Sequence, residues 1–252
     1  MSVGNWSRKS SFVRAGIVLL VVASGCAAAN VVSMQLTAPA PGPVLAGIYI
    51  SPYTALIGPA GQTKPNITGV STLVICDDFE TDVSTGTPPW QAIETNTASL
   101  QNETSADGAL KFDQGNAAQQ KSDYTVAAVL ATEILQAQKL GDVTAQGDLS
   151  FALWGLFDTA AGGPLSGSWV QGNDLTNAKN DLAAARTLVT NQGLTPSSFS
   201  NVNIFSPTPQ GASQEYIVVT MPEPGSPALL FIYLTGVLAL FFVFRRRLHI
   251  KG

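Results

Sequence analysis

Histidine is the scarcest residue that could carry chemistry in this chain. The 252 residues contain one, His249, in the last few positions. The stretch before Pro222 therefore has no histidine, which excludes a Ser-His-Asp or Cys-His catalytic arrangement and a His-ligated zinc there. No glycine-rich phosphate-binding loop follows a predicted strand. We therefore expect a protein that is not an enzyme and that needs no cofactor.

Basic side chains are also scarce in the central part of the chain. Residues 30–222 hold six Lys or Arg against sixteen Asp or Glu, a net charge of −10, although the whole chain carries only −4. An acidic domain of this kind repels phosphate backbones, so nucleic acid is not an expected partner. The stretch is long enough to form one folded core.

The first 29 residues have the order of a secretory signal peptide. Three basic residues precede a short apolar run (15–22), and small residues follow at 23–29. We expect signal peptidase to cut after Ala28 or Ala29. The stretch ending at Cys26 also loosely fits a lipobox, which makes lipidation of Cys26 an alternative. If this segment is removed, Cys76 is the remaining cysteine and cannot form an internal disulfide, so it is expected to be a buried thiol, an intermolecular pairing site or a reactive group.

The C-terminal part of the chain contains an apolar run that can span a membrane. Residues 225–244 are 20 uncharged residues, about 30 Å as a helix, which matches the hydrocarbon core of a bilayer. Arg245, Arg246 and Arg247 follow directly and would stop transfer and hold the tail in the cytoplasm. Residues 30–221 are then expected on the far side of the membrane; we call them the exported domain.

The tripeptide Pro222-Glu223-Pro224, followed by the apolar helix and the arginine cluster, resembles the PEP-CTERM sorting signal of Gram-negative bacteria. The resemblance covers residues 222–252. It implies that an exosortase, a membrane cysteine transpeptidase, recognises the tripeptide and removes the signal. The protein would pass through an inner-membrane intermediate to the cell surface or the extracellular polysaccharide. The alternative is a plain C-terminal anchor with a proline-rich stem.

The exported domain is predicted to be α+β, rich in strands and with a helical middle. Strands are expected within Gly47–Ile57, at Val70–Ile75, at Val202–Phe205 and at Tyr216–Thr220. Residues 31–47 suggest an entry segment or an edge strand, and 90–110 give little signal. Apolar residues at helical spacing predict a first helix from Ser122 or Asp123 to Gly141, a second from Asp148 to Phe157, and a third from Asn173 or Asp174 to Gly193.

An acidic cluster of Asp77, Asp78, Glu80 and Asp82 follows the predicted strand at Val70–Ile75. If the chain stays extended, Asp78, Glu80 and Asp82 share one face. Such a face is most often solvated, but the three carboxylates are also a weak candidate for a Ca²⁺ site.

Two short motifs resemble those of thioester-domain proteins, including PEP-CTERM members. Cys76 lies in Ile75-Cys-Asp-Asp-Phe79, and Trp154 ends Leu149-Ser-Phe-Ala-Leu-Trp154. In that family the cysteine joins a glutamine of the second motif in an internal thioester, which captures amines. The resemblance implies a thioester-like fold over roughly residues 47–158 and a reactive role for Cys76. Ser150 occupies the glutamine position here. Gln146 lies four residues earlier on the same helical face and could substitute only if the motif were shifted along the helix.

Three functional hypotheses follow. The first is an exported structural or adhesive protein of a biofilm, in contact with extracellular polysaccharide. The second is a covalent adhesin that uses Cys76. The third is a hydrolase that acts on polysaccharide through paired carboxylates.

Overall fold

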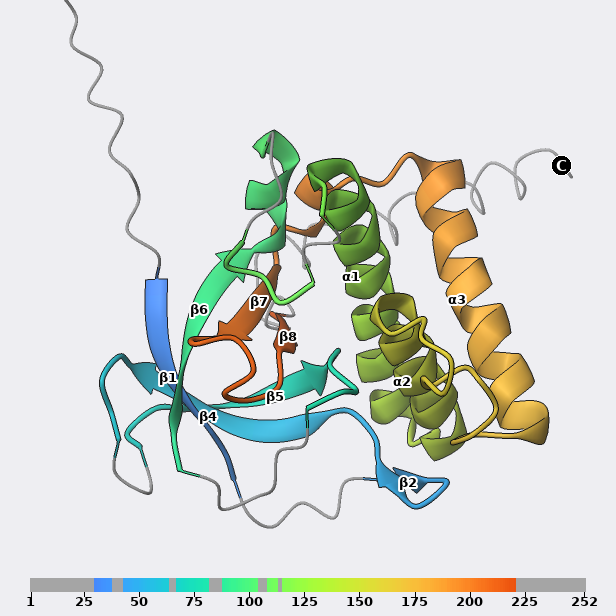
Figure 1. The fold of residues 1–252 in the computed structure, drawn as a ribbon, viewed down its shortest axis with the longest axis horizontal. Helices are drawn as coiled ribbons and strands as arrows, with labels where there is room; N and C mark the ends of the chain where they lie inside the picture. Colours follow the sequence, from blue (N-terminus) through green and yellow to red (C-terminus); the bar gives the residue numbers. More distant parts are fainter. Residues whose placement is uncertain are drawn as a thin grey trace, which may run out of the picture.

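The computed structural model describes residues 30–37, 43–63, 67–81, 88–103, 108–112 and 115–220. These residues form an antiparallel barrel with three helices packed along one side of it (Figure 1). The predicted signal peptide and sorting signal lie outside the described residues. Among the helices that are described, none is long and apolar enough to cross a bilayer.

Six strands close the barrel. In the order in which they neighbour one another they are β1 (Asn30–Leu36), β4 (Tyr53–Pro59), β5 (Val70–Cys76), β8 (Tyr216–Val219), β7 (Val202–Pro207) and β6 (Trp90–Asn96). β6 pairs back with β1, and every pairing is antiparallel. The last strand of the domain, β8, therefore lies between β5 and β7. A small hairpin of β2 (Val44–Leu45) and β3 (Ile48–Tyr49) extends from the barrel.

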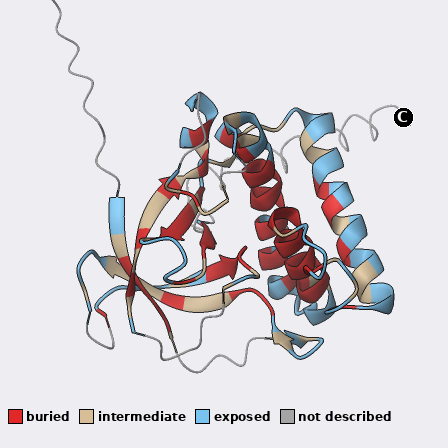
Figure 2. Cartoon of the chain, in the orientation of Figure 1, coloured by how far each residue is buried: buried red, intermediate tan, exposed pale blue. Residues whose placement is uncertain are grey.

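Alternate side chains of each strand enter two separate apolar cores, because successive strand residues point to opposite faces. Val74 and Cys76 belong to the core inside the barrel, whereas Ile75 belongs to the core between the barrel and the helices. In Figure 2 the two helices that lie next to the barrel are coloured mostly as buried residues, and these residues form the helical side of the second core. Strand β5 therefore contributes to both cores.

The three helices are α1 (Ala117–Leu140), α2 (Val143–Phe157) and α3 (Gly172–Gln192). Gly141 and Gly193 end α1 and α3 with positive φ, as the sequence predicted. The predicted start of α3 is within two residues of the observed one, whereas the predicted starts of α1 and α2 are wrong. Asn116 caps α1 before Ser122, and Asp142 caps α2 before Asp148. Asp148 is buried inside α2, where its carboxylate accepts a hydrogen bond from Asn177 of α3.

The predicted α+β class is confirmed, and the predictions for β5, β7 and β8 agree with the structure to within two residues. Of the two alternatives for residues 31–47, an entry segment or an edge strand, the edge strand is wrong, since β1 has a partner on each side. β6 was not predicted. Two short 3₁₀ helices, Thr97–Asn102 and Pro196–Phe199, complete the described elements.

Candidate functional site

Cys76 is the last residue of β5 and lies opposite Tyr216 of β8. Its side chain is 1% exposed, and its thiol donates to the backbone oxygen of Asp78 over 3.1 Å. Burial raises the pKa of the Cys76 thiol, and the neighbouring Asp77 and Asp78 raise it further. The thiol is therefore protonated at neutral pH, and the thiolate that attacks electrophiles is suppressed.

Helix α2 holds the backbone around Cys76 through a chain of buried hydrogen bonds. Trp154 donates its indole N–H to the Cys76 carbonyl over 2.9 Å. On the other side, the Cys76 backbone N–H donates to the Ser51 hydroxyl over 3.0 Å. The Ser51 backbone N–H in turn donates to the Ser150 hydroxyl over 3.2 Å. The structure thus brings together Cys76, Ser150 and Trp154, which the motif resemblance had paired.

The same contacts define what the site can do. A thioester needs an acyl group next to the sulfur, and a serine hydroxyl cannot supply one. Ser150 instead donates to the Gln146 backbone oxygen over 2.7 Å. The Gln146 side chain donates to the Asp142 backbone oxygen at the start of α2, 3.2 Å away, so its carboxamide is held within its own helix. The described contacts therefore show a braced, buried thiol with no acyl partner.

An aromatic cluster packs over this site. Phe79 lies 5.3 Å from Trp154 and 5.2 Å from Trp169, measured between ring centroids, and Phe151 completes the group. Trp169 is 49% exposed, and its indole N–H is fixed by the Gly162 carbonyl. The cluster shields the end of β5 from solvent.

The acidic segment after Cys76 is not the solvated strand that the sequence suggested. β5 ends at Cys76, and Asp78 is fully buried. Its Oδ2 forms an ion pair with Lys111 Nζ at 2.5 Å, and its Oδ1 accepts from the backbone N–H groups of Glu80 and Thr81. The segment bends because Asp78 binds the backbone that follows it.

Among the described residues, this bend does not bring the predicted calcium ligands together. Glu80 is exposed, whereas Asp78 is buried and engaged by Lys111. Asp82 lies outside the described residues, and the described ones contain no group of three ligands that could hold a metal ion. The calcium site therefore stays a prediction.

Sequence reasoning missed a second pair of acids, Asp77 and Glu215. Both are fully buried, and the register of β5 against β8 places them side by side. Glu215 Oε1 accepts from the Tyr124 hydroxyl over 2.5 Å, and its Oε2 accepts from the Lys111 backbone N–H over 2.9 Å and from the Ser206 hydroxyl. No local pattern could have revealed this pair, because it depends on strand pairing between distant parts of the chain.

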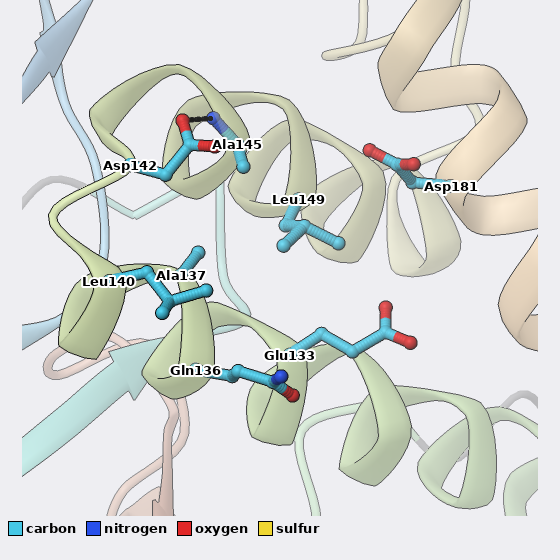
Figure 3. Close-up of a pocket in the computed structure, with 8 residues that line it drawn as sticks. All are labelled: Glu133, Gln136, Ala137, Leu140, Asp142, Ala145, Leu149 and Asp181. Carbon is cyan, nitrogen blue, oxygen red and sulfur yellow. Dashed lines mark hydrogen bonds between the residues drawn. The ribbon is translucent and has the colours of Figure 1, made fainter.

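An acidic pocket of about 280 Å³ opens between the three helices (Figure 3). Glu133 of α1 and Asp181 of α3 direct their carboxylates toward the same end of it, and Leu140 and Leu149 supply apolar walls. Burial raises the pKa of both carboxyls, and Asp181 raises that of Glu133 further. Asp142 also lines the pocket, but its carboxylate is already engaged by the Ala145 N–H as the α2 cap.

Comparison with known proteins gives little beyond this geometry. No protein-family model and no curated protein sequence matches the chain. A solved structure that is similar is the N-terminal thioester domain of fibronectin-binding protein SfbI from Streptococcus pyogenes. The match has a TM-score of 0.40 and 10% identity, and it covers 77% of this chain and 95% of that one. A TM-score of this size is below the level at which two chains share a fold, so the match assigns no role to Cys76.

Proposed function

We propose that this protein is an exported surface or extracellular-matrix protein of a Gram-negative bacterium, with a structural or adhesive role. In this proposal signal peptidase removes residues 1–29, and an exosortase removes the segment that begins at Pro222-Glu223-Pro224. The observation that carries the proposal is the order of segments in the sequence: a basic and apolar start, an acidic domain, then the tripeptide, an apolar run and three arginines.

The way the domain ends supports removal of the sorting signal. Strand β8 ends at Val219, and Thr220 is fastened to the Asn201 carbonyl by both its backbone N–H and its hydroxyl, each over 2.8 Å. The described part of the fold thus ends at Thr220, two residues before Pro222. Cleavage at the tripeptide would leave every described strand and helix in the released protein.

The surroundings of Cys76 favour adhesion by non-covalent contacts over covalent capture. The glutamine position of the thioester motif holds Ser150, which has no acyl group, and Gln146 is bonded within its own helix. The polysaccharide hydrolase has less support still. Asp77 and Glu215 are adjacent acids, but both are fully buried and neither reaches a glycosidic bond in this conformation.

The sorting step is tested by replacing Pro222, Glu223 and Pro224 together with alanine. We expect the wild-type protein at the cell surface or in the medium in a shortened form, and the triple variant at full length in the inner membrane. The measurement is fractionation with immunoblotting. Wild-type protein in a strain without exosortase should behave like the triple variant.

A single Pro227→Ala change is the matched control, because Pro227 lies beside the tripeptide but not in it. We expect this variant to be shortened and released like the wild type. Normal processing of the triple variant, or processing without exosortase, would contradict an exosortase signal at the tripeptide. Wild-type protein retained at full length in the inner membrane would show that the segment is an ordinary membrane anchor.

A further inference from the structure

Two fully buried carboxyl side chains meet where β5 ends and β8 begins. Strand pairing places Cys76 opposite Tyr216. Asp77 and Glu215 are the next residues outward on the two strands, so they lie side by side. Neither has any exposed surface. Two ionised carboxylates side by side in the protein interior would repel each other strongly.

The hydrogen bonds distinguish the two acids. Glu215 accepts from three donors, the Tyr124 hydroxyl, the Ser206 hydroxyl and the Lys111 backbone N–H, so both of its oxygens are engaged as a carboxylate would require. Donors of this kind stabilise a charged carboxylate in the interior. Glu215 is therefore the ionised member of the pair.

Asp77 has the opposite surroundings. Neither of its buried carboxyl oxygens receives a hydrogen bond of ordinary geometry, and the donor that acts to lower its pKa is its own backbone N–H. A buried carboxylate without donors or a paired cation is very unfavourable, and the group takes up a proton instead. A protonated carboxyl becomes a donor itself, and the carboxylate of Glu215 is in position to accept from it. We infer that Asp77 and Glu215 share one proton at neutral pH and that this proton fastens β8 to β5.

The charges around the pair agree with this inference. Burial is the main cause that raises the pKa of Asp77, and Glu215 and then Asp78 raise it further. Burial also raises the pKa of Glu215. Lys111, whose backbone N–H donates to Glu215, has its ammonium paired with Asp78. The other titratable groups that face the pair are phenols and a thiol whose pKa values are raised by burial, so they stay neutral: Tyr124, Tyr216 and Cys76.

We therefore expect the contact between β5 and β8 to weaken as the pH rises. The folded chain binds this proton more tightly than the unfolded chain does, so the stabilisation is complete at pH values below the ordinary pKa of a carboxyl. It is lost as the pH rises through the raised pKa of the pair. Loss of the proton leaves two adjacent charges, and β8, the strand that leads to the sorting segment, loosens first. This inference does not depend on the proposed function.

The test is amide hydrogen exchange, read by mass spectrometry on the full chain in detergent micelles between pH 6 and pH 9. After correction for the intrinsic pH dependence of exchange, we expect the protection of β8 amides to fall by about tenfold per pH unit above the pKa of the pair. Asp77→Asn keeps a donor toward Glu215 but has no proton to lose. Its β8 protection should therefore stay constant over the same range.

Two controls separate this contact from general effects of pH. Helix α3 carries other carboxyls but does not pack on β8, so its amides report the background in the same sample. Glu80→Gln removes an exposed acid three residues from Asp77 and should behave like the wild type. The inference is overturned if wild-type β8 amides change no more than α3 amides, a result that needs no variant. It is also overturned if a folded Asp77→Asn variant shows the wild-type pH dependence.

Discussion

Replacing Trp154 with alanine is expected to lower the free energy of unfolding by about 3–5 kcal/mol. Trp154 is 2% exposed and sits in the core between the barrel and the helices, against Phe79 and Phe151. Its indole N–H donates the hydrogen bond that links α2 to the Cys76 carbonyl. The change therefore opens a large cavity and also leaves a buried backbone oxygen without a donor. Urea unfolding followed by circular dichroism measures the loss.

Two further variants divide this effect into its parts. Trp154→Phe keeps most of the packing and removes the indole donor, so it should cost about 1 kcal/mol from the lost hydrogen bond plus a smaller packing term. Trp169→Ala removes the half-exposed member of the same cluster and should cost about 1 kcal/mol. If Trp154→Ala cost no more than Trp169→Ala, α2 would not be what braces the end of β5.

Replacing Lys111 with methionine is expected to cost about 3–5 kcal/mol, because it leaves the buried Asp78 carboxylate without its cation. Methionine keeps the apolar length of the side chain, which lies near the Phe112 ring. The Thr81 hydroxyl also loses the ammonium that donates to it over 2.9 Å. The measurement is the urea midpoint and slope at pH 7.

The double variant Lys111→Met with Asp78→Asn tests whether the charge is the cause. The asparagine side chain that replaces Asp78 can still accept from the backbone N–H groups of Glu80 and Thr81, but it carries no charge. The double variant should therefore recover most of the stability that Lys111→Met alone loses. Simple addition of the two single costs would instead mean that the ion pair contributes nothing specific.

Local patterns predicted the elements whose cause is local. Gly141 and Gly193 adopt positive φ and end their helices where the spacing of apolar residues stops. β5 was visible as a run of β-branched residues. The start of α2 was not visible in the sequence. This helix is buried on all sides, so it shows no single apolar stripe, and its cap at Asp142 precedes the apolar run.

The features that were missed depend on contacts between distant parts of the chain. β6 shows no clean alternation, because Ala92 and Ile93 are consecutive apolar residues, and it becomes a strand because β1 and β7 flank it. Cys76 and Trp154 were found from short motifs, and the structure brings them together. Asp77 was noted as one acid among several, but its neighbour Glu215 is set by the closure of the barrel.

The most direct test of the account is the intact mass of the protein recovered from the cell surface or the medium, before and after treatment with methylamine and with a thiol-alkylating reagent. The account predicts a chain that starts after Ala28 or Ala29 and ends near Glu223. No ammonia should be missing, methylamine should not change the mass, and Cys76 should be alkylated only after unfolding. A mass that still includes residues 228–252 would contradict the sorting step. A deficit of one ammonia, which methylamine converts into a mass one methylene above that of the unmodified chain, would contradict the free, buried thiol.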